Sequence, residues 1–256
     1  MKVTFLGTGA AWPSARHNNV CFVVHSREPV LFECGPSILY QLAVAGIDPG
    51  ELRTVIISHI HGDHALGLPM LLVSAQIANR RNPLTVCAPE STVEPLRRIC
   101  TTVYPSLGRL LASLVDWRPL PEKGSATLAL PSLSITTARA SHSVPVVSTH
   151  AAFAHASLAF SGDTAFCQDV ADNAAGTNLL IHESNWSLTL KTPTGHGHST
   201  AAEAGQVAAL AKAKRLALVH TSRELAGHEQ ELETEAAAHF PAGEVFAPAD
   251  SQTIDL

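Results

Sequence analysis

The chain has 256 residues, of which 46% are hydrophobic and 15% are charged, so it can form one large α/β domain or two small ones. This composition excludes an intrinsically disordered chain. The net charge of −5 and the absence of a Lys/Arg run argue against an extended basic surface for nucleic acid, although a metal pair can itself bind phosphate.

The chain begins with predicted strands. Three short runs are rich in β-forming residues and separated by turn residues, at positions 2–6, 20–25 and 30–33. A helix is predicted over residues 37–45, because apolar side chains recur at helical spacing and Gly46 follows as a stop signal. The apolar run 54–57 then predicts a buried strand.

Residues 65–79 are apolar on nearly every side, which predicts a helix that is covered on more than one side. Packing on a sheet covers one face, so the other is available for a subunit interface, and a homodimer through this helix is expected. Residues 84–87 predict a further strand. Residues 91–103 predict a helix with Ser91 as its N-cap.

The second half repeats this order. Four strands come first, at residues 127–130, 133–137, 146–152 and 157–160. Further strands are predicted at 179–182, 216–220, 244–247 and 252–255, and helices at 200–212 and 229–240. The expected architecture is a single α/β domain, residues 1–256. It is an αββα four-layer sandwich of two facing mixed sheets with helices outside, built of pseudo-equivalent halves of about 1–125 and 126–256.

The cysteines and the N-terminus bear on the compartment. Five widely spaced cysteines without a Cys-x-x-Cys pattern predict small core residues under reducing conditions. The N-terminal segment is too short and too interrupted by glycine for a signal peptide. No apolar run reaches the roughly 18 residues of a membrane span. A cytoplasmic protein without membrane contact is therefore expected.

One loop directly after the predicted strand 54–57 carries four metal-ligand side chains, namely His59, His61, Asp63 and His64. The first two leave an extended backbone on the same side and can bind one metal ion. The last two follow a glycine turn and can point toward a second ion. Imidazole suits zinc, iron or manganese, and a carboxylate supplies the oxygen of a two-metal site. A polar turn with surface histidines is the alternative.

Three further ligand-type residues each follow an apolar strand, namely His142, Asp163 and His220. Individually, a histidine at a strand end is more often part of a hydrogen-bonded scaffold, and the Gly-Asp-Thr around Asp163 is commonly a turn. With the first loop, the set comprises five histidines and two aspartates. It supplies about three ligands per metal ion and one bridging carboxylate, which leaves a position for water.

Several motifs follow one another along the chain, and each occurs once: Phe5-Leu6-Gly7-Thr8-Gly9, His59-Ile60-His61-Gly62-Asp63-His64, Gly67-Leu68-Pro69, Ser161-Gly162-Asp163-Thr164, His182-Glu183-Ser184, Gly197-His198-Ser199-Thr200-Ala201 and His220-Thr221-Ser222-Arg223. Their order over essentially the whole chain resembles the metallo-β-lactamase fold, and specifically its ribonuclease Z-like branch. The resemblance implies that one metal ion is held by His59, His61 and His142. The other would be held by Asp63, His64 and His220. Asp163 would bridge two divalent ions, usually zinc, with manganese or iron as alternatives.

His198 precedes the predicted helix 200–212, with Ser199 as the expected N-cap and Glu203 near a capping-box position. One interpretation is that this histidine merely occupies a helix start. The other is that the imidazole and the helix N-terminus bind an oxyanion and donate a proton to the leaving oxygen.

Glu183 lies on the predicted loop after strand 179–182, where it could hydrogen-bond His198 and keep it protonated. The resemblance gives both residues this catalytic role. The nearby His182 and His196 are expected to be scaffold or rim residues.

Four residues near the site loops are candidates for substrate binding. Trp12 and Trp186 could stack on a base or cover an apolar group, or they could simply pack. Arg16 and Arg223 are the nearest basic residues. Either could pair with a phosphate, or form a solvated ion pair.

These patterns predict a dinuclear metal-dependent hydrolase, most consistent with a phosphodiesterase for a small-molecule or nucleotide phosphodiester. A metal-bridging hydroxide would attack, Asp63 would orient it, and His198 would protonate the leaving group. The phosphodiester class follows from the resemblance of the His198 and Glu183 motifs to the phosphodiesterase branch. The alternatives are a hydrolase of lactones, thioesters or sulfate esters, a ribonuclease Z-type RNA endonuclease, and a non-enzymatic scaffold, which the full ligand set least supports.

Two departures from the tRNA 3′-end ribonucleases favour a small substrate, such as a cyclic nucleotide or cyclic sugar phosphate. Those enzymes carry a long Gly- and Pro-rich arm between the motifs matched by His142 and Asp163, an interval of only about twenty residues here. They also have an Asp-Cys-Gly-Glu-Gly-Thr-Gln segment, in place of which this chain has Glu33-Cys34-Gly35-Pro36-Ser37.

Overall fold

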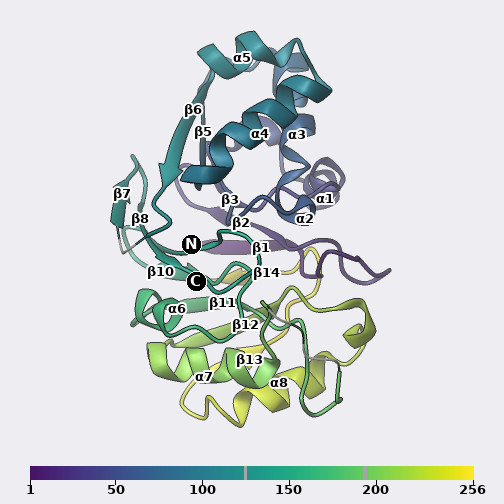
Figure 1. Ribbon diagram of the computed structural model, residues 1–256, viewed down its shortest axis with the longest axis vertical. Coiled ribbons are helices and arrows are strands. Elements are labelled where there is room, and N and C mark those ends of the chain that lie inside the picture. Colours follow the sequence, from purple (N-terminus) through teal and green to yellow (C-terminus); the bar gives the residue numbers. More distant parts are fainter. Residues whose placement is uncertain (124–125, 193–194, 196) are drawn as a thin grey trace.

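The computed structural model describes residues 1–123, 126–192, 195 and 197–256. Their strands form two seven-stranded sheets. The sheets lie face to face in the middle of the molecule, and helices cover both outer sides (Figure 1). This arrangement confirms the predicted αββα sandwich.

The first sheet has the strand order β14-β1-β2-β3-β4-β5-β6. Its strands are β1 (Lys2–Gly7), β2 (Cys21–His25), β3 (Val30–Phe32), β4 (Thr54–Ile56), β5 (Leu84–Pro89), β6 (Val115–Leu120) and β14 (Thr253–Asp255). Pairing is antiparallel from β14 to β3 and parallel from β3 to β6. The last strand of the chain thus pairs with the first.

The second sheet has the order β13-β12-β11-β10-β9-β8-β7. Its strands are β7 (Ala126–Ala129), β8 (Ser134–Arg139), β9 (Val147–Ala152), β10 (Ser157–Phe160), β11 (Leu179–Glu183), β12 (Arg215–Val219) and β13 (Glu244–Phe246). Strands β7 to β10 are antiparallel and β10 to β13 are parallel, as in the first sheet. Buried parallel strands read as continuous apolar runs, which is why these strands were predictable.

Helices pack on the outer face of each sheet (Figure 1). The first sheet carries α1 (Ile38–Val44), α2 (Gly62–Ala65), α3 (Leu68–Ile77), α4 (Glu90–Val103) and α5 (Leu107–Ser113). The second carries α6 (Gln168–Asn173), α7 (Ala201–Ala211) and α8 (Glu229–Ala237). Two short 3₁₀ helices, η1 (Pro49–Glu51) and η2 (Arg223–Leu225), lie in connecting loops.

Phenylalanine side chains fill the space between the sheets. Phe22 stacks on Phe32 with ring centroids 4.6 Å apart, and Phe160 of the second sheet meets Phe22 edge-on at 5.4 Å. These three rings are at most 2% exposed, and each contributes about 1.5–3 kcal/mol of burial energy. This packing fixes one sheet against the other, which matters because the candidate site is built from both.

The structure corrects several expected details. The predicted helix 65–79 corresponds to α3, which begins only at Leu68, and Ala65 instead ends the separate short helix α2. Gly67 lies between the two helices, where a Cβ atom would lie only 2.0 Å from the carbonyl oxygen of Gly35. Ser91 is not the cap of α4, since that helix begins at Glu90 after Pro89. The helices α2, α5 and α6 and the strand β6 were not predicted.

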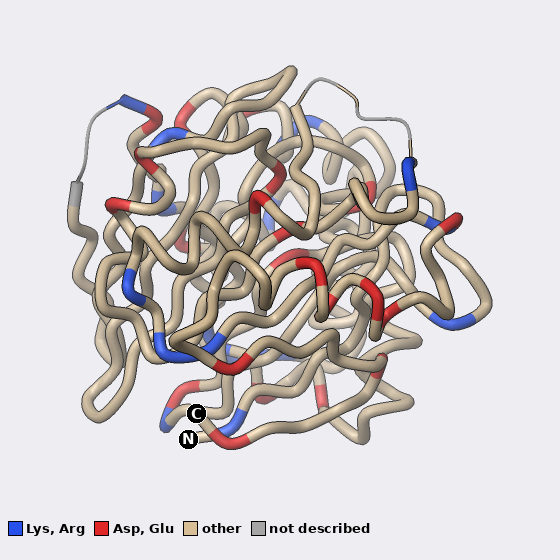
Figure 2. Tube along the Cα trace, turned by 90° about the horizontal axis from the view of Figure 1, so that it is seen from below, with Lys and Arg blue, Asp and Glu red and all other residues tan. Residues whose placement is uncertain are grey.

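Two outer surfaces bear on expected partners. In α3, Met70 and Ile77 are 40% and 77% exposed in the single chain, and the homodimer stays a prediction. In the view of Figure 2, Lys and Arg are spread along the trace and interspersed with Asp and Glu. Among the described residues, no helix combines the length and the apolar character needed to cross a membrane.

Candidate metal centre

Seven side chains meet at the ends of strands from both sheets. His59 and His61 follow β4, and Asp63 and His64 lie in the short helix α2 just beyond them. The second sheet contributes three residues that follow β8, β10 and β12, namely His142, Asp163 and His220. The ligand atoms form two groups in which all atoms lie within 4.8 Å of one another, and Asp163 belongs to both.

The first group contains His59, His61, His142 and Asp163. The Nε2 atom of His142 lies 3.3 Å from Nδ1 of His61 and 3.9 Å from Oδ2 of Asp163. Nε2 of His59 lies 3.6 Å from the same carboxylate oxygen. Ligands about 2.1 Å from a tetrahedral ion are about 3.4 Å apart, so this spacing suits one divalent cation.

The second group contains Asp63, His64, His220 and Asp163. Nε2 of His64 lies 3.1 Å from Oδ2 of Asp63 and 3.3 Å from Oδ1 of Asp163. Nε2 of His220 lies 3.4 Å from Oδ2 of each aspartate. Asp163 thus has its two oxygens between the groups, as expected of a bridging carboxylate.

The outer nitrogens of His142 and His59 are hydrogen-bonded, and that of His64 faces a carboxylate at ion-pair distance. Nδ1 of His142 donates to the carbonyl oxygen of Gly197 at 2.6 Å. Nδ1 of His59 lies 2.9 Å from the Ser58 hydroxyl, and Nδ1 of His64 lies 3.4 Å from the Glu33 carboxylate. Such contacts fix the ring orientation and direct Nε2 to the centre. Neither Ser58 nor Glu33 was predicted to support a metal ligand.

Buried atoms without partners test whether this set fits metal ions. Nε2 of His59, Nε2 of His64 and Oδ1 of Asp163 are buried and have no hydrogen-bond partner among the described residues. A buried polar atom without a partner is costly. Two cations would satisfy all three atoms, so the cluster of His and Asp residues is consistent with a dinuclear metal site.

The electrostatics of the cluster also suit cations. Burial lowers the pKa of His59, His61 and His142, which favours the neutral imidazole that binds metal. Burial opposes a charge on His64, but the carboxylates of Asp163 and Glu33 raise its pKa above the ordinary value. These negative charges favour a positive charge at this point.

Two left-handed backbone positions aim residues into the site. Gly162 has φ +61°, and a Cβ atom there would lie 2.8 Å from Cγ1 of Val146, so only glycine fits beside Asp163. His220 has φ +54° although it is not glycine. Such a conformation costs about 1–3 kcal/mol and is typical of functional sites.

A third group joins Glu183, His198 and His220. Nδ1 of His198 lies 2.9 Å from Oε1 of Glu183, which also accepts from the backbone N–H of Thr164 at 2.7 Å. Glu183 is the last residue of β11 rather than part of the following loop, and it is completely buried. Burial raises the pKa of Glu183 and lowers that of His198, which brings the proton affinities of the pair together.

The start of α7 holds His198 in place. Thr200 is the N-cap of α7, not Ser199, and its hydroxyl accepts from the backbone N–H of Glu203 in a capping box. Ser199 instead donates its backbone N–H to Glu183 at 3.0 Å and its hydroxyl to the carbonyl oxygen of Thr164.

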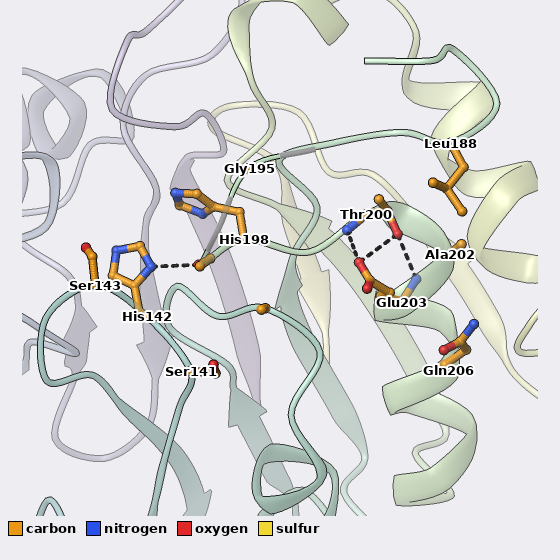
Figure 3. A pocket seen from close by; sticks show the side chains of 12 residues that line it. Ser141, His142, Ser143, Leu188, Gly195, His198, Thr200, Ala202, Glu203 and Gln206 are labelled. Carbon is orange, nitrogen blue, oxygen red and sulfur yellow. Dashed lines mark hydrogen bonds between the residues drawn. The ribbon is translucent and has the colours of Figure 1, made fainter. Parts of the chain in front are cut away.

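Two hollows meet at His198. The smaller, about 220 Å³, is lined by His61, Asp63, Asp163, His198 and His220 and by Trp12, Trp186 and Arg223. The larger, about 710 Å³, lies between His142 and His198 on one side and Thr200 and Glu203 on the other (Figure 3). Arg16 lines neither hollow.

The two other histidines of this region differ in their placement. His182 is buried in β11 and belongs to none of the three groups. His196 lies outside the described residues.

Comparisons with known proteins agree with this architecture. A family model described as Anti-Pycsar protein Apyc1 matches residues 1–240. Ribonuclease Z of Methanothermobacter thermautotrophicus is 30% identical, in an alignment covering 96% of this chain and 94% of that protein.

Solved structures show the same fold. The metallo-β-lactamase fold protein YhfI of Bacillus subtilis superposes with a TM-score of 0.82 at 21% identity, covering 99% of this chain and 98% of its own. The short form of human tRNase Z gives 0.78 at 24% identity, covering 100% and 99%. The chain therefore has a metallo-β-lactamase fold, is related to ribonuclease Z, and belongs to the Anti-Pycsar protein Apyc1 family.

Proposed function

We propose that the chain is a metal-dependent hydrolase, specifically a phosphodiesterase that acts on a small or nucleotide-type phosphodiester. The observation that carries this proposal is the His198–Glu183 pair, whose ligand-type atoms lie within 4.8 Å of His220. A proton donor beside a metal-ligand cluster is the arrangement that ester hydrolysis requires. The seven ligand roles given above are part of this proposal.

Cations bound at the two groups would supply Lewis acidity that activates water and neutralises charge on the phosphoryl oxygens. Asp63 would orient the attacking water, since its carboxylate lies at the edge of the small hollow. Burial opposes ionisation of Asp63, yet hydrogen bonds from His220 and His64 keep its pKa well below the ordinary value. Asp63 therefore stays an anionic acceptor.

His198 is proposed to protonate the leaving oxygen. Its Nδ1–H is held by Glu183, so Nε2 is the nitrogen left for the substrate. Glu183 in turn accepts backbone hydrogen bonds from Thr164 and Ser199, which keep the pair in place. Thr164 and Ser199 thus orient Glu183, and Glu183 orients His198, as in other sites where a third group holds a catalytic acid or base in position.

Three observations support a small phosphodiester. Ribonucleases cleave phosphodiester bonds, and a relative of that name aligns with 96% of the chain. The interval between His142 and Asp163 is taken up by strands β9 and β10, which leaves little chain for a protruding arm. The hollow at the metal groups measures about 220 Å³, which suits one small group.

The test compares two esters with leaving groups of different basicity. The His198→Ala variant should lose about 10²–10⁴-fold in kcat on a nucleoside cyclic phosphate, whose alkoxide leaving group needs a proton. It should lose less than about tenfold on bis-p-nitrophenyl phosphate, because nitrophenolate leaves without one. Both assays are run with Zn²⁺ or Mn²⁺, and with His155→Ala, an exposed histidine between β9 and β10, as the matched control.

The outcomes separate the two parts of the proposal. No metal-dependent turnover of either ester above a His64→Ala variant would reject the phosphodiesterase. An equal loss on both esters would reject the proton-donor role alone. Turnover of lactones, thioesters or sulfate esters without turnover of phosphodiesters would favour that hydrolase class.

A second candidate function is that of an RNA endonuclease, because relatives of this chain are named ribonuclease Z and ribonuclease BN. Cleavage of an unstructured oligoribonucleotide at a kcat/KM well above that of the cyclic phosphate would favour it over the small-substrate enzyme.

A further inference from the structure

Glu235 of α8 is a buried carboxylate that lies outside the set of residues in the proposed mechanism. The residue is only 7% exposed. Helix α8 packs directly on α7, because a Cβ atom at Gly205 of α7 would lie only 2.3 Å from the carbonyl oxygen of Ala236. This close approach, which glycine permits, brings the Glu235 carboxylate to the start of α7.

The carboxylate accepts four hydrogen bonds from two separate parts of the chain. Oε2 accepts from the Ser187 hydroxyl at 2.5 Å and from the backbone N–H of Thr189 at 3.0 Å. Oε1 accepts from the backbone N–H of Leu188 at 3.0 Å and from that of Ala202 at 3.1 Å. The first three donors follow β11, whereas Ala202 lies in the first turn of α7, and Leu188 and Ala202 lie side by side in Figure 3. One side chain thus ties together the two ends of the connection from β11 to α7.

The chemistry of a carboxylate is needed for this contact. All four donors are uncharged groups, and each oxygen of Glu235 accepts from two of them. Burial opposes ionisation, but the hydrogen bonds from Ser187, Thr189 and Leu188 lower the pKa of Glu235 below its ordinary value. A glutamine side chain has the same size but only one acceptor oxygen, so it cannot satisfy both pairs of donors.

The segments that Glu235 ties together surround His198. The backbone N–H of Trp186 donates to the carbonyl oxygen of Ser199 at 3.1 Å, and the N–H of Ala201 donates to the carbonyl oxygen of Trp186 at 3.0 Å. The indole of Trp186 meets the His198 ring edge-on, with ring centroids 6.4 Å apart. The imidazole therefore packs on one of these segments and directly precedes the other.

We propose that Glu235 is a positioning residue for proton transfer, which keeps the imidazole of His198 in the geometry needed to reach the leaving oxygen. In the described part of the chain, Glu235 belongs to none of the three groups of ligand-type atoms, so it acts through Trp186 and the start of α7. This inference rests on the proposed function.

The alternative is that Glu235 only stabilises the fold. The two roles differ in their effect on esters with different leaving groups. Loss of a purely structural contact lowers the hydrolysis of every ester equally, because it lowers the fraction of active protein. Loss of a positioning contact affects only those esters whose leaving group needs a proton.

The first test uses Glu235→Gln in the zinc-loaded chain. Its kcat on a nucleoside cyclic phosphate should fall about 10–100-fold, since a displacement of about 1 Å can cost that much. Its kcat on bis-p-nitrophenyl phosphate should change less than about twofold, because nitrophenolate leaves without a proton. Glu231→Gln, at an exposed position of the same helix, is the matched control and should behave as wild type does on both esters.

A double-mutant comparison tests whether Glu235 acts through His198. In the His198→Ala background, Glu235→Gln should cost less than about twofold on the cyclic phosphate, because the group that it positions is already gone. Ser187→Ala removes one of the four hydrogen bonds and should lower kcat on the cyclic phosphate alone, by about threefold to tenfold. This milder variant keeps the test decisive if Glu235→Gln folds poorly.

Amide hydrogen exchange, followed by NMR, gives a readout that does not need turnover. The backbone N–H groups of Leu188, Thr189 and Ala202 should exchange about 10–100-fold faster in Glu235→Gln than in wild type, because they lose their shared acceptor. The amides of the buried strand β12 should exchange as they do in wild type, which shows that the change is local.

Three results would overturn the positioning role. They are an equal loss on the two esters, a loss in the His198→Ala background as large as that in wild type, and unchanged exchange of the three amides. If wild type hydrolyses the esters and any of these results is found, the positioning role alone is rejected. A wild-type chain that hydrolyses neither ester would reject the proposed function and this role with it.

Discussion

Glu33 shows how one residue outside the ligand set can control it. It is completely buried and has φ +64°. Its Oε1 accepts from the backbone N–H of Ser58 at 3.1 Å, and its Oε2 lies 3.4 Å from His64. Glu33→Gln keeps the size but removes the charge, so we expect metal affinity to fall about 10–100-fold in a chelator competition titration. Unchanged affinity, equal to that of the exposed control Glu51→Gln, would contradict this role.

His182 makes stability depend on pH. Burial lowers the pKa of His182 from 6.5 to about 4. As the pH falls, the imidazole is therefore protonated in the unfolded chain before it is protonated in the folded one. The contribution of the neutral His182 ring to the free energy of unfolding is fully present above about pH 6.5. It is lost as the pH falls from about 6.5 to about 4. Between about pH 7 and about pH 5, wild type should lose about 2 kcal/mol more unfolding free energy than His182→Leu. Urea titrations with parallel losses in both proteins would refute this.

At the residue scale, the candidate ligands were predictable and their supports were not. His59 and Asp163 directly follow apolar strands, and the chemistry of the side chain is visible in the sequence. Glu33 lies 25 positions before Ser58, and only the folded sheet brings their atoms together. Both Arg223 and Arg16 lie close in sequence to the site loops, and both were predicted as substrate-binding candidates. Only Arg223 lines the small hollow.

The capping box of α7 is the element-scale feature with a measurable effect. Thr200 accepts from Glu203 N–H at 3.2 Å, and Glu203 in turn accepts from Thr200 N–H at 2.8 Å. Thr200→Ala should lower the unfolding free energy by about 1 kcal/mol because a buried helix start loses its partner. Thr102→Ala, at an exposed position of α4, is the control and should change stability by less than about 0.5 kcal/mol. Equal effects of the two substitutions would contradict a capping role.

Elements with a clear apolar period were predictable, and elements without one were not. Strand β6 includes Trp117, Arg118 and Pro119 and is partly exposed at the sheet edge, so it has neither alternation nor a continuous apolar run. Helix α6 has six residues, too few to show a helical period. The cap of α7 was misplaced by one position because Ser199 and Thr200 carry the same type of side chain.

At the scale of the whole molecule, the cations are expected to join the two sheets. The candidate ligands come from the loop after β4 and from α2 on one side, and from the segments that follow β8, β10 and β12 on the other. Removing metal with EDTA should therefore lower the unfolding free energy by about 4 kcal/mol per ion if each is present at about 1,000 times its Kd. Calorimetric scans of the chain with and without Zn²⁺ measure this, and elemental analysis should find about two ions per chain. Coincident scans would show that the ions do not bridge the sheets.

The division of the ligands between the two sheets has a consequence for turnover of the protein itself. A chain that loses its ions would open more often along the boundary between the layers and expose the phenylalanine cluster around Phe22. Proteases degrade such open forms, so the abundance of the protein should follow the supply of metal in its surroundings. A shortage of metal would then lower the amount of the protein as well as its activity.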